Sequence, residues 1–235
     1  MKTIAFIRLH QFDGYQQEVM DQIGQYCDGI LFLTHDLINE RMYELARNHQ
    51  KCIEIRHWKK RFNNLSQLQF CLNWASEIKP KYVLEFDEDE IPPYHFNEVF
   101  NEFKKSNKTT LWLKGVWAYN NIDQIAIEPM RKYFFHMKAY KWSKALAKQE
   151  RAGFNSFRGI TYKSDSAFLS KYPLKHLAFL TPRLRNHRMI VGGSKGHKYN
   201  NSSWFMQNVN TVPYDKNKTN KDWMKIYHET ISNNS

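Results

Sequence analysis

The chain has 235 residues, of which 42% are hydrophobic and 15% aromatic, so it can form a folded core and is not generally disordered. No run approaches the roughly 20 apolar residues of a membrane-spanning helix, and Arg8 cuts the apolar stretch at residues 3–7 too early for a signal peptide. Cys27, Cys52 and Cys71 form no CxxC pair, which argues against a disulfide framework and a structural zinc site. These features predict a cytoplasmic protein.

The net charge of +12 is divided unevenly along the chain. Residues 1–103 carry 11 Lys and Arg against 16 Asp and Glu, whereas residues 104–235 carry 24 against 7. A reversal of sign between the two halves suggests that the second half meets an anionic partner. Because there is no internal repeat and no clear linker, we expect residues 1–235 to form a single domain.

Strand and helix signals alternate over the first hundred residues. Apolar, β-rich runs predict four strands, at residues 4–9, 29–34, 52–55 and 82–86. Helical signals separate them at residues 15–26, 37–49 and 65–78, the last ended by Lys79-Pro80. This alternation predicts βαβ units, and therefore an α/β fold with an open, mostly parallel sheet flanked by helices.

The pattern loosens beyond residue 103. Residues 110–119 are expected to form a strand or a hairpin arm. Residues 140–151 are expected to form a helix with a cationic stripe of Lys141, Lys144, Lys148 and Arg151. After residue 170 the chain is rich in Gly, Asn, Pro and Lys, so we expect mostly loop with short helical pieces.

An acidic segment, Asp87-Glu88-Asp89-Glu90, follows the strand predicted at residues 82–86, and two prolines soon end the extended chain. In open α/β sheets, ligands bind outside the carboxyl ends of the strands. Carboxylates two residues apart repel each other unless a proton or a cation lies between them, and hard oxygen ligands favour Mg²⁺ or Mn²⁺. The alternative is a solvated acidic turn that caps the next helix.

The acidic segment resembles the DxD motif of GT-A glycosyltransferases, particularly family 2-like enzymes. Residues 27–36 look like the second strand and its acidic end, and residues 174–185 are similar to a late stretch with His, Thr-Pro and Arg. Residues 37–39 depart from the pattern, because Leu-Ile-Asn replaces Ser-Thr-Asp. The resemblance implies a GT-A-like, Rossmann-like fold and metal-dependent transfer of a sugar from a nucleotide-sugar, with a UDP-sugar as the preferred donor.

The resemblance also implies roles for particular residues. Asp87, Asp89 and His176 would bind Mn²⁺ or Mg²⁺, with His187 and His197 as fallbacks for the third ligand. Asp87 and Asp36 would also contact the donor. The chemistry of the transfer, apart from the resemblance, calls for cations at the departing diphosphate. The cluster of Arg183, Arg185 and Arg188, together with Lys195 of a glycine-bearing loop at residues 192–198, which is not a Walker A motif, could supply them. The same loop could instead be a disordered basic surface segment.

An inverting enzyme needs a base that deprotonates the acceptor hydroxyl. Acids are scarce after residue 103, and we favour Asp123, in a stretch expected to be irregular. Glu90, the last residue of the acidic segment, is the second candidate, although it could merely compensate a helix N-terminus. A retaining mechanism stays open.

The second half suggests a polyanionic acceptor. Residues 131–198 contain 16 Lys and Arg against two acids, interleaved with aromatic residues, a combination typical of surfaces that bind nucleic acid or anionic headgroups. Two acceptors remain open: modified DNA in a host cytoplasm, as for some bacteriophage enzymes, and an anionic glycan or lipid at the inner membrane face. Two other functions also compete, a metal-dependent nucleotidyltransferase or nuclease and a non-catalytic nucleic-acid binder.

Overall fold

The computed structural model describes residues 2–9, 14–35, 40–58, 64–127, 135–143, 166–179 and 209–233. They form two compact units. The first unit contains residues 1–89, 97–113 and 136–170, and the second contains residues 90–96, 114–135 and 171–235. Within the described ranges, no helix is long and apolar enough to cross a membrane.

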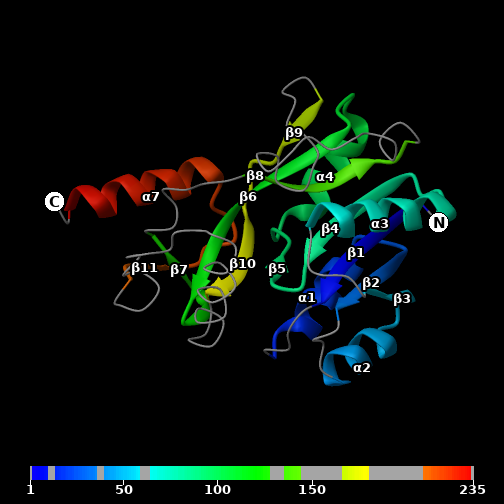
Figure 1. Ribbon diagram of the computed structural model, residues 1–235. Coiled ribbons are helices and arrows are strands. Elements are labelled where there is room, and N and C mark those ends of the chain that lie inside the picture. Colours follow the sequence, from blue (N-terminus) through cyan, green and yellow to red (C-terminus); the bar gives the residue numbers. More distant parts are fainter. Residues whose placement is uncertain are drawn as a thin grey trace. The chain divides into compact units, whose positions relative to one another are not determined.

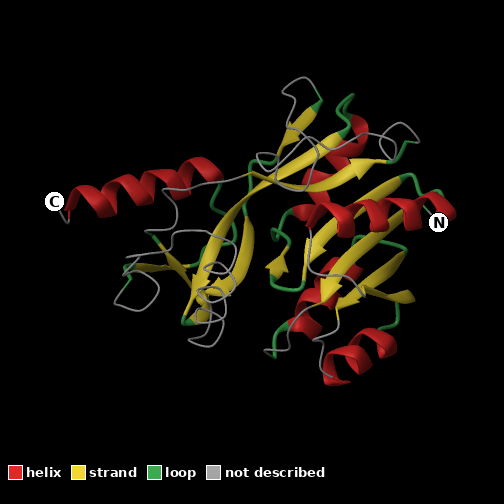
Figure 2. Ribbon diagram, viewed as in Figure 1, coloured by secondary structure: helices red, strands yellow, loops and turns green. Residues whose placement is uncertain are grey.

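The first unit is built on a parallel sheet. Its first four strands, joined in turn by three helices, are β1 (Thr3–Leu9), β2 (Gly29–His35), β3 (Cys52–Trp58) and β4 (Tyr82–Asp87) (Figure 1). The helices are α1 (Gln16–Gly24), α2 (Glu40–Asn48) and α3 (Asn64–Ile78). The strand order is β4-β1-β2-β3, with each neighbouring pair parallel, and Figure 2 shows helices running beside these strands. The predicted α/β fold with a mostly parallel sheet flanked by helices is confirmed.

Burial explains these elements. All seven residues of β1 are buried, as expected for an apolar strand between two others. On α1, Val19, Met20 and Ile23 form the buried stripe. Helix α3 ends where predicted, because Lys79 takes a left-handed conformation (φ 54°) and Pro80 cannot continue the helix.

The first unit also contains most of β8 (Phe135–Lys141), which lies antiparallel beside β4. The start of the helix predicted at residues 140–151 is therefore wrong, because Tyr140 and Lys141 belong to this strand. The charges are spaced as in a helix, but the side chains of residues 136–140 are all buried, which a strand packed on both faces explains. Residues 144–151 lie outside the described ranges.

Most of α4 (Phe96–Lys105), β9 (Ala167–Leu169) and the first residues of β6 (Thr110–Tyr119) complete the first unit. Strand β9 lies parallel to the start of β6. The strand predicted at residues 110–119 is confirmed with the same limits.

The second unit is a smaller mixed sheet. Its strands, in spatial order, are β5 (Glu90–Ile91), β10 (Leu174–Phe179), the rest of β6, β7 (Asn121–Ala126) and β11 (Thr211–Pro213). Strands β6 and β7 form a tight hairpin, with Asn120 in the left-handed region (φ 63°).

Helix α7 (Asn220–Asn233) belongs to the second unit and is longer than the short helical pieces expected after residue 170. Its Trp223 is fully buried against Val116, Ile125 and Ile127. The side chain of Thr219 accepts from the N–H of Asp222, and Asp222 in turn accepts from the N–H of Thr219, which is a capping box. The prediction from composition missed both the apolar residues of this helix and its cap.

Strand β3 is the outermost strand of the parallel set among the described residues. Its Arg56 forms ion pairs with Glu54 and Glu77, at 2.8 and 2.6 Å. The guanidinium lies 4.5 Å from the centre of the Trp74 ring, whose N–H donates to Glu54.

Candidate functional site

The acidic segment begins where the strand order of the first unit reverses. From β1 the chain first builds outward through β2 and β3, and then β4 returns to the other side of β1. In open α/β sheets, the crevice outside the carboxyl ends of such a strand pair is the preferred ligand site. Leu9 ends β1 and Asp87 ends β4, so the acidic segment starts at this point.

Asp87 is held by an arginine from the neighbouring strand. Arg8 lies directly beside Asp87 in the parallel register of β1 and β4. Its Nη2 and Nε lie 2.6 and 2.8 Å from the same carboxylate oxygen, Oδ1. The Arg8 side chain is only 7% exposed and that of Asp87 is 22% exposed. The pair therefore fixes a partly accessible carboxylate at the carboxyl edge of the sheet.

The role of Arg8 is missed by sequence reasoning, which treats this residue only as an interruption of an apolar run. A charged residue near the end of a strand that is buried along its whole length is the signal that could have identified it, because a buried charge requires a partner. The identity of that partner depends on the β1–β4 register, which joins residues 79 positions apart.

The remaining acids near the end of β4 are buried. Glu85, Glu88 and Asp89 of the first unit are 2%, 7% and 8% exposed. The alternative of a solvated acidic turn does not describe these side chains. Burying several carboxylates is costly unless polar partners or cations compensate their charges.

A fully buried lysine lies in the same unit. Lys138 of β8 is 0% exposed, and its Nζ lies 5.4 Å from the centre of the Phe86 ring. Fully buried lysines are rare, and this one belongs to the strand next to β4. No sequence signal distinguishes Lys138, because it lies among the many basic residues at positions 131–198, whose pattern indicates only a basic surface.

The metal site predicted from the sequence has no cluster of three ligands among the described residues. No group of three His, Cys, Asp or Glu side chains within the described ranges lies close enough to hold one. Asp87 is already paired with the Arg8 guanidinium. The triad of Asp87, Asp89 and His176 therefore stays a prediction.

His176 and Glu90 are brought together in the second unit. They are direct partners in the antiparallel pairing of β10 with β5. Glu90 is 0% exposed, whereas His176 is half-buried. Beside His176, Lys175 is buried and its Nζ lies 3.8 Å from the centre of the Tyr214 ring.

Asp123 also belongs to the second unit. The irregular stretch expected around it is not found. Asp123 is part of β7, with an exposed side chain. Its N–H donates to the Asn121 side chain at 2.9 Å, and its carbonyl accepts from the N–H of Tyr214 at 2.7 Å. The backbone at this position is thus fixed while the carboxylate is accessible to solvent.

The other predicted site residues lie outside the described ranges. They are Asp36, Arg183, Arg185 and Lys195, together with the fallback ligands His187 and His197.

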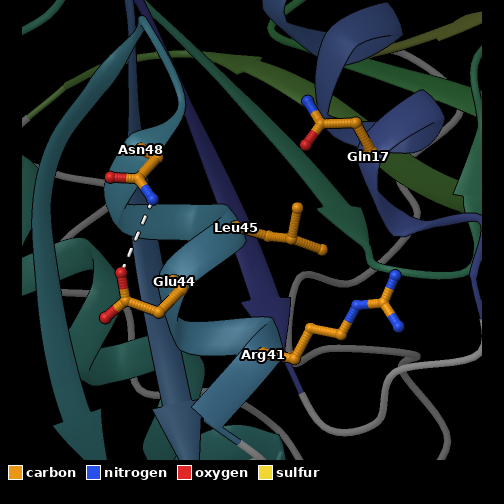
Figure 3. A pocket seen from close by; sticks show the side chains of 5 residues that line it. All are labelled: Gln17, Arg41, Glu44, Leu45 and Asn48. Atoms are coloured by element: carbon orange, nitrogen blue, oxygen red, sulfur yellow. Dashed lines mark hydrogen bonds between the residues drawn. The ribbon is translucent and has the colours of Figure 1, made fainter.

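A small pocket of about 190 Å³ lies on the first unit near α1 and α2, and Figure 3 shows its lining side chains. Arg41 and Leu45 project from α2, Gln17 comes from α1, and Asn48 donates to Glu44 at 3.5 Å. None of these residues belongs to the acidic segment, and this pocket adds nothing to the candidate site.

No family model matches the chain, and no curated protein matches it. Solved structures with a similar fold include 4-diphosphocytidyl-2C-methyl-D-erythritol synthase from Anaerococcus prevotii, at 15% identity and a TM-score of 0.39, covering 60% of this chain and 71% of that one. Residues 1–349 of TarS from S. aureus match at 10% identity and a TM-score of 0.43, over 60% and 47% of the two chains. The bifunctional IspDF from Campylobacter jejuni matches at 8% identity and a TM-score of 0.44, over 72% and 49%. The chain therefore spans about half the length of the latter two.

Proposed function

We propose that the chain is a glycosyltransferase of the GT-A type, which transfers a sugar from a nucleotide-sugar to an acceptor. The observation that carries this proposal is the Arg8–Asp87 pair at the carboxyl ends of β1 and β4, where the strand order reverses. A carboxylate fixed there can accept hydrogen bonds from the ribose hydroxyls of a bound nucleotide. The buried acids that follow agree with a site whose charges are compensated from within the fold.

The chemistry of the transfer places negative charge on the departing diphosphate. Cationic side chains aimed at this charge lower the barrier, and we assign this role to Arg183, Arg185 and Lys195. Asp36 is proposed as a further donor contact. Mn²⁺ or Mg²⁺, bound by Asp87, Asp89 and His176, remains part of the proposal, but no step is derived through it.

Asp123 is the preferred general base, because its carboxylate is exposed and its backbone is held on both sides. Glu90 is the second candidate. If Asp123 is the base, Asp123→Asn lowers turnover by about 10²-fold or more while nucleotide binding is unchanged. Equal loss of binding and turnover contradicts this assignment.

Thermal unfolding with UDP and GDP, each with and without Mn²⁺, tests the donor site. A nucleotide at about 100 times its Kd should stabilise the folded chain by about 2.7 kcal/mol, because it binds only the native state. Asp87→Asn and Asp89→Asn should abolish the shift relative to each variant's own Tm. Asp215→Asn, just after β11, removes the same charge elsewhere and should retain it.

The absence of a response to every nucleotide would contradict the proposal. A shift with nucleoside triphosphates, but not with UDP or GDP, would instead favour a nucleotidyltransferase. Transfer from a labelled UDP-sugar to hydroxymethylated duplex DNA tests the modified-DNA acceptor. Label in an anionic glycan but not in DNA would assign the acceptor to the membrane face.

A further inference from the structure

A second cleft lies at the opposite edge of the parallel strands of the first unit. Its volume is about 520 Å³, within the range of small-ligand sites. It adjoins the amino ends of β1 and β4, because Thr3 and Tyr82, the first residues of these strands, line it. The acidic segment follows the carboxyl end of β4 and contributes no lining residue.

The cleft is strongly basic. Its charged lining residues are four lysines and one aspartate: Lys2, Lys51, Lys81, Lys104 and Asp28. Within the described ranges, none of the four ammonium groups lies within 4.0 Å of a carboxylate. The lysines come from separate segments of the chain, so their convergence is a property of the fold and not of a run of basic sequence.

Asp28, the one acidic residue that lines the cleft, is hydrogen-bonded to the backbone. Asp28 accepts hydrogen bonds from the N–H groups of Thr3 and Lys2, at 2.9 and 2.7 Å, and these bonds hold the pKa of its carboxyl below the usual value. Lys51 is anchored in a similar way, because its Nζ donates to the carbonyl of Cys27 at 2.8 Å. Asp28 attracts Lys51 and Lys104 without an ion-pair contact, and the lining still carries four lysine charges against this one carboxylate.

Two of the lysines are held against aromatic rings. Lys104 Nζ lies 4.0 Å from the centre of the Phe100 ring and 5.7 Å from that of Tyr82, and Lys81 Nζ lies 5.5 Å from that of Tyr82. Burial lowers the pKa of Lys104. An ammonium that has lost part of its hydration gains more from a bound anion than a fully solvated one does.

We propose that this cleft binds a ligand with two linked phosphate groups, at a site separate from the acidic segment. Several ammonium groups from different segments match the negative charge that a diphosphate spreads over its oxygen atoms. Each lysine binds these oxygens as a compact positive charge. Tyr82 is only 7% exposed, so its ring is not available for base stacking, whereas the half-buried Tyr26 also lines the cleft. Inorganic pyrophosphate is the simplest probe.

Competitive acetylation of lysines, read by mass spectrometry, locates binding on the intact chain. The reaction is run at low salt with EDTA, so that no metal-dependent site is occupied. Pyrophosphate at about ten times its dissociation constant should slow acetylation of Lys81 and Lys104 by about tenfold, because only the unoccupied fraction reacts. Lys105, exposed on the same helix as Lys104 and outside the cleft, should react at an unchanged rate.

Charge-changing variants provide the second arm. Lys104→Met keeps the aliphatic stem and should weaken pyrophosphate binding by about tenfold. Lys81→Met serves the same purpose if Lys104→Met does not fold. Asp28→Asn keeps an oxygen acceptor for the backbone and should tighten binding, whereas Lys105→Met should leave it unchanged.

Equal protection of Lys104 and Lys105, or equal weakening by Lys104→Met and Lys105→Met, would reduce the effect to general attraction by a basic chain and overturn the proposal. Lack of any protection at saturating pyrophosphate would overturn it as well. If the chain bound no nucleotide at the acidic segment, the proposed function would fail, but the results expected for pyrophosphate at this cleft would be unchanged.

Discussion

The ion pair between Arg8 and Asp87 joins two strand ends, and its burial makes it sensitive to the loss of either partner. Removing one member of a buried pair leaves an uncompensated charge, which typically costs about 3–5 kcal/mol. Because Asp87 is 22% exposed, we expect Arg8→Met to lower the free energy of unfolding by about 2–3 kcal/mol. Urea denaturation at neutral pH measures this difference.

The double variant Arg8→Met with Asp87→Leu is the matched control. Replacing both charges removes the uncompensated carboxylate, so part of the lost stability should return. Additive losses in the double variant would mean that the two side chains are not coupled.

His49 should make the free energy of unfolding depend on pH. Burial lowers the pKa of its imidazole, and the Asp21 carboxylate, 3.3 Å away, only partly opposes this. Below about pH 6.5 the unfolded chain therefore takes up this proton more readily than the folded one, so stability falls as the pH decreases toward the folded pKa. We expect His49→Gln to make the loss of unfolding free energy between about pH 7 and pH 5 shallower, as measured by urea denaturation across this range.

The exposed His228→Gln is the comparison for that experiment, because it removes an imidazole that is not buried. A wild-type slope in His49→Gln would show that other groups carry the pH dependence.

At the residue scale, the sequence predicted the position of the acidic segment but not its environment. The prolines after Glu90 and the apolar strand before Asp87 are local signals, and these are visible in the sequence itself. The partners are not local: Arg8 meets Asp87 through strand register, and His176 meets Glu90 through a pairing over a long separation. The hypothesis for the catalytic residues depends on such pairings, which explains why the roles of Asp123, Asp89 and His176 stay predictions.

At the scale of elements, α7 shows what stabilises the second unit. Trp223 is its fully buried anchor, stacked on Tyr214 at 6.0 Å between ring centres. Trp223→Ala should destabilise this unit by about 3–5 kcal/mol, because it removes a large buried side chain and leaves a cavity.

Hydrogen exchange measures the effect separately in the two units. Amides of β7 and α7 should lose protection in Trp223→Ala, whereas amides of β1 and β2 in the first unit should keep theirs. Tyr227→Ala, at a half-buried position on the same helix, is the comparison and should have a smaller effect. Unchanged protection of β7 would contradict the anchoring role of Trp223.

The elements of the first unit were predictable because each combined an apolar run with a clear end, as Lys79-Pro80 does for α3. The start of the helix predicted at residues 140–151 is wrong, because the periodic charges carry no information on the buried residues that precede them. In β8 those residues pack beside β4, and this tertiary contact overrides the local pattern. The single domain expected from the absence of a linker stays a prediction, since compact units need not fold independently.

At the scale of the whole molecule, the net charge of +12 and its concentration in residues 104–235 predict strongly salt-dependent binding of polyanions. If about six phosphates of duplex DNA are contacted, affinity should fall by roughly 10³-fold between about 50 and 200 mM salt. Fluorescence anisotropy with labelled DNA measures this slope. Binding that is insensitive to salt would contradict an electrostatic contact, and no binding at the lower salt concentration would contradict DNA as the anionic partner.

The charged network on β3 bears on how separate molecules meet. A sheet can extend from one molecule to the next only if its outer strand has backbone N–H and C=O groups that a strand of another molecule can reach. Arg56 forms ion pairs with Glu54 and Glu77 and lies over the Trp74 ring, so charged side chains are held in place along this outer strand. Charged side chains on an outer strand disfavour its pairing with a strand of another molecule, so we expect this arrangement to oppose lateral growth of the parallel sheet.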